Sequence, residues 1–291
     1  MARQAVLVVE ADVTAIIREE RIGGQRLLLG DCLEVMPLLG RFDAVVTSPP
    51  YDDLRAYGEG FSGVDCCEVI KNVARLMGLG GVCVWNVADQ TINGSETGSS
   101  FRQALAAMDA GLNLHDTMIY ERAQAFGGAK TAYLHSFEYM FVFSNGSPQT
   151  FNPIRDRANA RPGVESVTKG GRRRDGTIPE RHRRETQEFG KRKNIWRYGV
   201  GGEKTEHPAV MPRQMAEDHI LSWTNEGYTI LDPFMGSGTT LVACHKLGRL
   251  GTGIEIDPEY FDIACKRVDK ATRQADLFVA PPAAPTQETL I

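Results

Sequence analysis

The chain reads Asp232-Pro233-Phe234-Met235-Gly236-Ser237-Gly238-Thr239-Thr240 directly after an apolar run that extends from Tyr228 to Leu231. A strand, a glycine-rich turn and a helix in that order place the free N–H groups of a helix N-terminus at the carboxyl end of the strand. Gly236 and Gly238 allow the backbone to approach a bound molecule closely. The stretch therefore predicts an α/β sheet with a ligand site where this strand ends.

Three kinds of ligand compete for the glycine turn. A phosphate-binding loop has Lys followed by Ser or Thr after its last glycine, whereas this turn has Thr239 and Thr240. A dinucleotide fingerprint has a third glycine where Leu241 stands. A nucleoside cofactor remains, because Glu255 ends the next expected strand, where a carboxylate can accept hydrogen bonds from ribose hydroxyls. We expect the turn and Glu255 to form one cofactor site.

A second motif, Thr47-Ser48-Pro49-Pro50-Tyr51, follows the apolar run from Phe42 to Val46. Two prolines stop sheet pairing and hold the local φ angles, so that backbone carbonyls point away from the ladder. The serine oxygen and a fixed carbonyl provide two hydrogen-bond acceptors for an amino group, and the tyrosine ring offers a stacking surface. Taken alone, the motif is equally compatible with a plain turn that closes a strand.

The remaining pattern alternates between strands and helices, as an α/β sheet does. Strands are expected at 27–29, 42–46, 82–87, 114–120, 139–144, 228–231 and 250–256, and helices at 69–77, 101–110, 212–223, 239–247 and 258–273. Residues 1–25 are ambiguous, because Val6 to Val9 suits a strand but Arg18 to Gly24 breaks any continuation. The chain divides into an α/β half (22–146), an insert without sustained periodicity (147–203), a second α/β half (204–274) and a tail expected to be disordered (275–291).

Charge is distributed unevenly along the 291 residues, whose net charge is -4. Between Arg155 and Arg197 there are 14 Lys or Arg and only 6 Asp or Glu, so this segment is strongly basic within an acidic protein. Such a segment suits contact with a polyanion, although charge runs are often only solvated surface.

Composition excludes several other classes of protein. Hydrophobic residues make up 42% and charged residues 24% of the chain, as in ordinary globular proteins. No stretch approaches the roughly 18 apolar residues of a membrane span, and the N-terminus does not resemble a signal peptide. The 6 cysteines show no CxxC spacing, so we expect a reduced, cytoplasmic protein without a metal site.

The two motifs together resemble those of the amino-methylating DNA methyltransferases, which modify cytosine N4 or adenine N6 with S-adenosylmethionine. Three further segments resemble elements of this family: Gly30-Asp31-Cys32-Leu33 its adenosine-contacting segment, Phe137 to Phe143 its last sheet strand, and His207-Pro208-Ala209-Val210-Met211-Pro212 the element beside the methionine end of the cofactor. The order of motifs is similar to the permuted β group, in which a central insert reads the target sequence. The resemblance implies a doubly wound, Rossmann-like mixed sheet with an inserted target-recognition region at 147–203.

The resemblance also implies the roles of individual residues. The catalytic residues would be Ser48, Pro49, Pro50 and Tyr51. The cofactor-binding residues would be Asp31, Cys32, His207, Pro208, Asp232, Pro233, Phe234, Gly236, Ser237, Gly238, Thr239, Glu255 and Ile256. The DNA-binding residues would be Arg172, Arg173, Arg174, Arg181, Arg183, Arg184, Lys191, Arg192 and Lys193, mostly as phosphate contacts.

The implied reaction is methyl transfer from S-adenosylmethionine to a flipped base in duplex DNA. Serine at position 48, where adenine-modifying relatives more often carry Asp or Asn, favours cytosine N4 over adenine N6. Carbon-5 methylation would need a Pro-Cys nucleophile, and the sequence contains no Pro-Cys dipeptide. A nicotinamide-dependent oxidoreductase and a non-catalytic DNA-binding module are the alternatives from other classes. A cognate restriction endonuclease and a homodimer are left open as partners.

Overall fold

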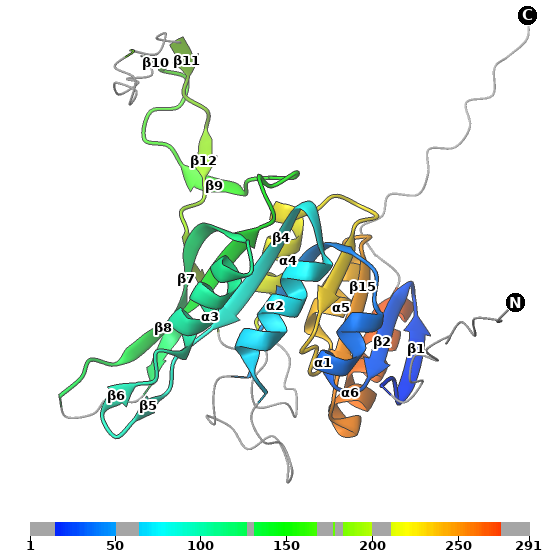
Figure 1. Ribbon diagram of the computed structural model, residues 1–291. Helices are drawn as coiled ribbons and strands as arrows, with labels where there is room; N and C mark the ends of the chain where they lie inside the picture. The colour runs from blue at the N-terminus through cyan, green and yellow to red at the C-terminus, as the bar shows by residue number, and fades with distance from the viewer. Residues whose placement is uncertain are drawn as a thin grey trace, which may run out of the picture.

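The computed structural model describes residues 15–50, 64–126, 131–167, 177, 183–199 and 211–274. Nine of the described strands form one sheet in the order β1-β2-β15-β14-β3-β4-β8-β7-β13 (Figure 1). Their bounds, in that order, are Arg18–Ile22, Gln25–Leu29, Leu250–Glu255, Thr229–Asp232, Phe42–Thr47, Met77–Val87, His135–Ser144, Asn113–Phe126 and Ile195–Tyr198. The expected strand Val6 to Val9 and the tail 275–291 lie outside the described residues.

The centre of the sheet is parallel and its two sides are mixed. Strands β2, β15, β14, β3 and β4 run parallel to one another. β1 is antiparallel to β2, and β8 is antiparallel to both β4 and β7. β13 pairs in parallel with β7. The expectation of a doubly wound mixed sheet is therefore confirmed.

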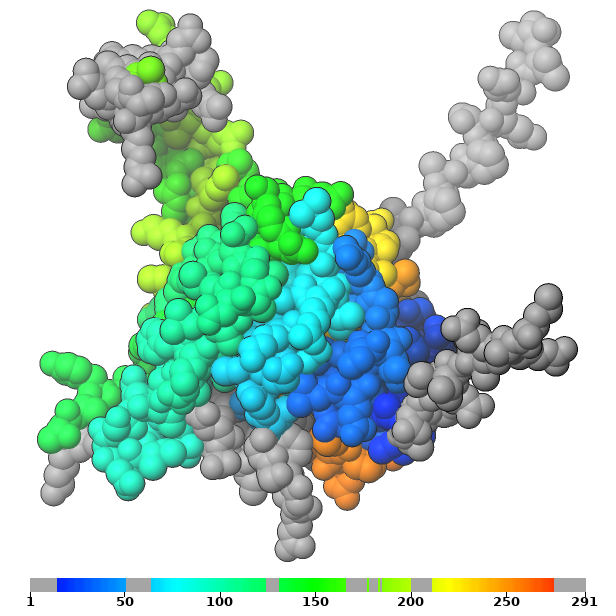
Figure 2. Space-filling model, viewed as in Figure 1, coloured from blue at the N-terminus to red at the C-terminus, as the bar shows by residue number. Residues whose placement is uncertain are grey.

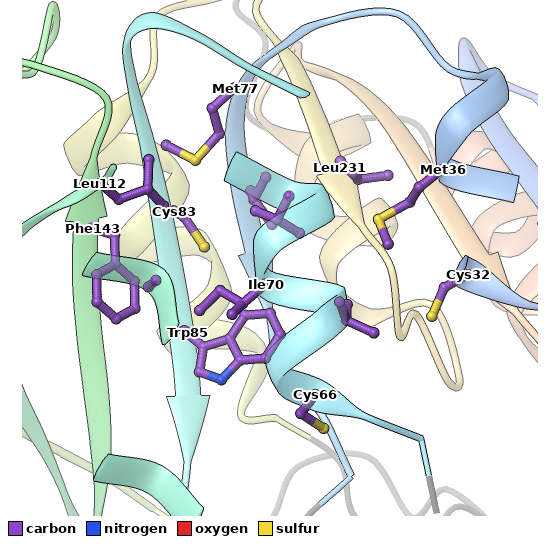
Figure 3. Packing of buried hydrophobic residues seen from close by; sticks show 14 of the residues in the cluster. Cys32, Met36, Cys66, Ile70, Met77, Cys83, Trp85, Leu112, Phe143 and Leu231 are labelled. Carbon is purple, nitrogen blue, oxygen red and sulfur yellow. The ribbon is translucent and has the colours of Figure 1, made fainter. Parts of the chain in front are cut away.

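Helices cover both faces of the sheet (Figure 1). On one face, α1 (Cys32–Val35), α2 (Cys66–Leu76) and α3 (Ser99–Asp109) pack over a core that contains Trp85 and Phe143 (Figure 3). On the other face, α4 (Arg213–Trp223), α5 (Thr239–Lys246) and α6 (Pro258–Arg273) cover two further apolar clusters. The short 3-10 helix η1 (Met36–Leu38) follows α1. Both faces of the parallel strands are buried, which accounts for their continuous apolar runs.

The topology reverses between β14 and β3. From β14 the chain passes through α5 to β15 on one side, whereas from β3 it passes through α2 to β4 on the other side. Ligands of open α/β sheets bind outside the carboxyl ends of the strands at such a switch point. Both sequence motifs stand at this point, because each follows one of these two strands.

The N-terminal hairpin was missed by the sequence pattern. Arg18 to Gly24 was expected to break a strand, but Arg18–Ile22 is β1 and pairs with β2. The turn between them is Gly23-Gly24, with φ angles of 55° and 82°. Two consecutive residues with positive φ suit a tight hairpin turn, and glycine adopts them without strain.

The basic insert forms two ribbons that stand away from the sheet (Figures 1 and 2). β9 (Arg155–Ala158) pairs with β12 (Phe189–Lys191), and β10 (Glu165–Val167) pairs with β11 (Arg183–Glu185). We call these two ribbons the arm. The predicted insert 147–203 also contains β13, which belongs to the main sheet, so the arm is shorter than that range. A small hairpin of β5 (Thr91–Ile92) and β6 (Ser95–Glu96) precedes α3.

Candidate active site

A buried hydrogen bond joins the two motifs. Thr47, the last residue of β3, donates through Oγ1 to Oδ1 of Asp232, the last residue of β14, over 2.7 Å. Asp232 also accepts the N–H of Phe234 at 3.1 Å. Burial raises the pKa of Asp232, and its hydrogen bonds with Thr240, Thr47 and the backbone of Phe234 oppose that rise. The proline turn and the glycine turn are therefore held side by side at the switch point.

Glu255 lies at the end of β15, next to the glycine turn. Its Oε2 accepts the N–H of Gly236 at 2.8 Å, and its Oε1 accepts those of Ile256 at 3.0 Å and Asp257 at 2.9 Å. Burial raises the pKa of Glu255 to about 7, against the effect of these hydrogen bonds. A carboxylate has about four lone-pair positions, so one remains for a hydroxyl donor. This geometry fits the expected ribose contact.

Helix α6 supports the glycine turn from below. Gly238 has a φ of +79°, and a Cβ at this residue would lie 3.0 Å from the Cβ of Ala264. Arg267, one turn along α6, donates through Nη1 to the carbonyl of Ser237 at 2.5 Å and to its hydroxyl at 2.7 Å. The same nitrogen lies 3.2 Å from Oγ1 of Thr239. Glycine at 238 is required by the close approach of α6 as well as by its φ.

The end of β2 completes this edge of the sheet. Leu29 of β2 pairs with Glu255 of β15, and the N–H of Gly30 donates to the carbonyl of Glu255 at 2.9 Å. Asp31 follows at once and caps α1 by accepting the N–H of Leu33 at 2.8 Å. The next residue, Cys32, is buried. Asp31 therefore lies beside the Glu255 backbone, as a joint cofactor contact requires.

Burial of the predicted cofactor residues varies along the turn. Pro233, Ser237 and Thr239 are buried, Phe234 and Gly236 are half-buried, and Ile256 is exposed. The ring of Phe234 meets that of Trp85 edge to face, with centroids 6.2 Å apart. Figure 3 shows Trp85 in the core between β4 and α2, so Phe234 links the glycine turn to that core. His207 and Pro208 lie outside the described residues.

The proline turn begins where β3 leaves the sheet. Pro49 is buried, whereas Ser48 and Pro50 are half-buried. The carbonyl of Pro50 accepts a weak hydrogen bond from Sγ of Cys66, at 3.9 Å, which ties the turn to the first residue of α2. In the register of β3 with β4, Thr47, the residue before Ser48, pairs with Trp85. Tyr51 lies outside the described residues.

The predicted DNA-binding residues have different environments. Arg183, Lys191 and Lys193 are exposed on or beside the arm. Arg192, also predicted as a phosphate contact, is half-buried and pairs with both Asp156 and Asp218 at 2.5 Å. The side chain of Arg184 and all of Arg172, Arg173, Arg174 and Arg181 lie outside the described residues.

Sequence reasoning did not single out Arg267 or the side chain of Thr47. Arg267 stands three residues after Ala264 on α6, and this spacing places both residues on one helical face toward the turn. The sequence signal for this contact was a small residue, Ala264, followed three positions later by a hydrogen-bond donor, Arg267. Thr47 was included in the motif, but its partner could be identified only once β3 and β14 were known to be neighbours.

The described residues contain no group of three or more His, Cys, Asp or Glu side chains that could hold a metal ion. No helix in the same part of the chain is long and apolar enough to cross a membrane.

Comparison with known proteins places this geometry in a family. Residues 42–266 match a family model described as DNA methylase, of the N6 and N4 type. The orphan methyltransferase M.BamHII of Bacillus amyloliquefaciens is 46% identical over 249 residues, which cover 82% of this chain and 90% of that protein. The type II methyltransferase M.SmaI of Serratia marcescens is 26% identical, over 88% of this chain and 95% of that protein.

Solved structures share the fold. A complex of M1.HpyAVI with SAM superposes with a TM-score of 0.56 at 24% identity, over 84% of this chain and 99% of that one. The cytosine-N4-specific PvuII DNA methyltransferase superposes with a TM-score of 0.60 at 18% identity, over 85% of this chain and 90% of that one. The family match covers both motifs and every strand from β3 to β15, and the chain therefore belongs to the DNA methylase family of N6 and N4 methyltransferases.

Proposed function

We propose that the chain is a site-specific DNA methyltransferase that transfers a methyl group from S-adenosylmethionine to the exocyclic N4 of a flipped cytosine in duplex DNA. The observation that carries this proposal is the 2.7 Å hydrogen bond between Thr47 and Asp232. It holds the turn suited to an amino group beside the turn suited to a nucleoside cofactor. Membership in the DNA methylase family supports methyl transfer to DNA.

The cofactor assignment is supported by the fit of the residues around the glycine turn. When bound, S-adenosylmethionine supplies an electrophilic sulfonium methyl group. Glu255 provides a carboxylate acceptor for ribose, and Gly238 allows the turn to pack close to α6. The M1.HpyAVI structure, of the same fold, contains SAM. Among the alternatives, a nicotinamide-dependent oxidoreductase leaves the proline turn without a role.

Ser48 and Pro49 would act on the amino group of the target base. An exocyclic amine is a poor nucleophile, because its lone pair is delocalised into the ring. Hydrogen bonds from its two N–H groups to the Ser48 hydroxyl and the Pro49 carbonyl favour a tetrahedral nitrogen with a localised lone pair. Positioning that nitrogen in line with the methyl group supplies much of the rate acceleration. Pro50 would keep the turn rigid, and Tyr51 would stack on the flipped base.

The choice of cytosine rests on Ser48. Adenine-modifying members of the family more often carry Asp or Asn at this position, and serine therefore favours cytosine N4. The same two acceptors also suit adenine N6, which is the alternative substrate.

The basic arm is proposed to read the target sequence. Arg183 and Lys193 are exposed there, as contacts to phosphate require. A cognate restriction endonuclease stays an open partner, since M.BamHII is named an orphan enzyme and M.SmaI a type II methyltransferase.

We also propose that two copies of the chain associate through the outer face of α3. Phe101, Leu105 and Met108 follow one another at helical spacing and are 51%, 59% and 46% exposed. Arg102 and Asp109 flank this stripe, and neither has an ion-pair partner among the described residues. In an antiparallel two-fold pairing, Arg102 of one copy faces Asp109 of the other while the apolar side chains meet. Figure 2 displays the outer side of α3 on the surface that faces the viewer.

The test of the proposed activity is incubation of duplex DNA with methyl-labelled S-adenosylmethionine, followed by nucleoside analysis. The proposal expects N4-methylcytosine, whereas N6-methyladenine would select the alternative base. Ser48→Ala should lower the single-turnover rate by about a hundredfold, as loss of a donor or acceptor in other active sites does, while cofactor affinity is retained. Ser95→Ala, on the exposed β6 strand, is the matched control. DNA binding without any methyl transfer would instead indicate a non-catalytic DNA-binding module.

A further inference from the structure

Arg192 lies at the root of the arm, between β12 and β13. Its backbone N–H donates to the carbonyl of Ile154 at 2.8 Å, and Ile154 directly precedes β9. The two strands of the first ribbon therefore enter and leave the main body of the protein at this residue. The side chain of Arg192 therefore lies where the arm joins the main body of the protein.

The guanidinium of Arg192 bridges two carboxylates from different parts of the fold. Nε and Nη2 contact Oδ2 of Asp156, in β9, at 2.7 and 2.5 Å. Nη1 donates to Oδ2 of Asp218, in α4, at 2.5 Å. The guanidinium carbon also lies 5.2 Å from the ring centroid of Trp196 in β13. Burial lowers the pKa of Arg192, but the hydrogen bonds to Asp156 and Asp218 raise it more, so the side chain stays charged.

Asp218 is the buried end of this bridge and is only 5% exposed. Besides Arg192, its carboxylate accepts the hydroxyl of Tyr198 at 2.9 Å and the amide of Gln214 at 2.8 Å. A buried carboxylate is stable only while it is paired and hydrogen-bonded. Loss of the arginine would leave Asp218 without its cation and loosen β13 and α4 together.

Helix α4 connects this bridge to the proline turn. It packs against β3 and α5. Met215 and Ile220 of α4 share a buried cluster with Ala44 and Val46 of β3, and β3 ends at Thr47, beside Ser48. Well-packed interiors transmit small displacements. A continuous packed path therefore runs from the root of the arm to the residue that would hold the target amine.

The charge balance argues against a phosphate contact for Arg192. One guanidinium faces two carboxylates, so this group carries a net charge of -1. A phosphate that approached it would have to compete with Asp156 and Asp218 for the same donors. The neighbouring Lys191 and Lys193 are exposed and have no acidic partner within the described residues.

We propose that Arg192 is a positioning residue, which ties the root of the arm to α4 and so keeps the arm in register with the proline turn. This inference rests on the proposed function, in which the arm reads the target and the turn holds the base. Arg192 acts through Asp156 and Asp218 and does not touch the DNA. Its loss should therefore impair recognition of the target sequence while the salt dependence of DNA affinity stays unchanged.

The test compares Arg192→Gln with Lys193→Gln and Arg197→Gln. Arg197 is an exposed arginine in β13 that pairs with Glu121. It serves as the control, because the same arginine-to-glutamine substitution is made there outside the bridge. Single-turnover methylation is measured on a cognate duplex and on duplexes with one changed base pair, and DNA affinity is measured over a range of salt concentrations. Cofactor affinity is followed by calorimetry.

Arg192→Gln should lower the cognate rate by about tenfold to a hundredfold, since small misplacements have such effects. It should also reduce discrimination between cognate and changed duplexes, with the salt slope of DNA affinity and the cofactor affinity unchanged. Lys193→Gln should show the opposite signature, a slope smaller by up to about 0.9 with discrimination retained. Arg197→Gln should match the wild type. A smaller salt slope with intact discrimination for Arg192→Gln would overturn the proposal, as would wild-type behaviour throughout.

Two additions keep the test decisive. Asp156→Asn removes only the exposed end of the bridge, so it should fold normally and shift rate and discrimination in the same direction. Hydrogen exchange provides a readout that needs no activity: β9 and β12 should exchange faster in Arg192→Gln while β14 is unchanged. If the wild type transfers no methyl group to DNA, the proposed function fails. The exchange result still shows whether Arg192 holds the root of the arm in place. Unaltered exchange at β9 and β12 would refute the bridge itself.

Discussion

At the scale of single residues, the site depends on polar side chains that are buried at strand ends. Asp232 and Glu255 are both carboxylates whose pKa is raised by burial. Asp232 accepts the N–H of Phe234 in the turn after β14. Glu255 accepts the N–H of Gly236 in that same turn and those of Ile256 and Asp257 after β15. Carboxylates whose pKa is raised in this way are common at functional sites. Their hydrogen bonds tie the glycine turn to the ends of β14 and β15.

Glu255→Gln should reduce the pH dependence of stability and weaken cofactor binding. The pKa of Glu255 is raised from 4.5 to about 7, so the folded protein binds this proton more tightly than the unfolded chain does. The stability contributed by the group is present below about pH 4.5 and is lost as the pH rises through 7. Glutamine does not ionise, so the loss of stability between pH 5 and pH 8 should be about 1–3 kcal/mol smaller in the variant than in the wild type. At any one pH the variant also loses hydrogen bonds, because its NH2 group cannot accept the backbone N–H groups that the carboxylate accepts.

Urea unfolding at pH 5 and pH 8 measures this difference. The same substitution should weaken S-adenosylmethionine binding by tenfold or more, because the ionised acceptor for ribose is lost. An equal change in stability from pH 5 to pH 8 in the two proteins would contradict the raised pKa of the carboxylate. Undiminished cofactor affinity would instead remove Glu255 from the cofactor site.

Thr47→Val should lower the folding stability, because it removes the hydrogen bond between the two motifs. The variant keeps the shape of the side chain but removes the donor that binds Asp232 at 2.7 Å. A buried acceptor that loses its partner costs about 1–3 kcal/mol of folding free energy. Thr47→Ser retains the hydroxyl and should be close to the wild type. Chemical denaturation of the three proteins is the measurement, and a valine variant as stable as the serine variant would show that the hydrogen bond contributes little.

At the scale of secondary-structure elements, α6 has two roles. Its apolar face, with Phe261, Ala264 and Val268, packs on the sheet. Its polar side chain Arg267 reaches the glycine turn and donates to the carbonyl of Ser237. The helix therefore determines both the position and the conformation of the turn that precedes α5.

Arg267→Met should raise the KM for S-adenosylmethionine several-fold while kcat changes little. Methionine keeps the apolar stem but loses the donors to Ser237 and Thr239, so the turn samples conformations that do not bind the cofactor. DNA affinity should be unaffected. Lys266→Met, at the exposed neighbouring position, is the control. Steady-state kinetics at saturating DNA provide the test, and an unchanged KM would show that α6 holds the turn by packing alone.

At the scale of the whole molecule, the arm and α3 lie on the same side of β3 and β14 as β7 and β8 (Figure 1). The arm projects from the root that Arg192 ties to α4, and the apolar stripe of α3 lies on the opposite face of the sheet from α4. Self-association through the stripe therefore leaves α4 uncovered.

Leu105→Glu should convert the proposed dimer into a monomer. Leu105 is 59% exposed at the middle of the stripe, and two carboxylates near a two-fold axis would repel each other. Leu79→Glu places the same charge at a residue that is 79% exposed elsewhere on the surface, and should leave assembly unchanged. Sedimentation velocity distinguishes the two states. A wild type that sediments as a monomer at micromolar concentration would reject this interface.

The sequence by itself determined the class of the fold and the two turns of the site. Strand and helix periods are local properties, so most elements could be predicted, including the helix over 258–273 that became α6 (Pro258–Arg273). The glycine and proline motifs could also be recognised from the sequence, because backbone conformation restricts which residues such turns accept. The hairpin of β1 was missed, because its charged strand lacks a buried face and only its pairing with β2 stabilises it.

Tertiary structure alone decided which side chains meet. The hydrogen bond from Thr47 to Asp232 joins residues 185 positions apart, and no local pattern encodes their distance. Arg192 has the same sequence environment as the exposed lysines beside it, yet it turns inward to Asp218, because α4 brings a buried carboxylate to the root of the arm. Local sequence specifies backbone preferences through steric limits and periodicity. The partners of a charged side chain depend on which distant elements pack together, and only the folded chain establishes that.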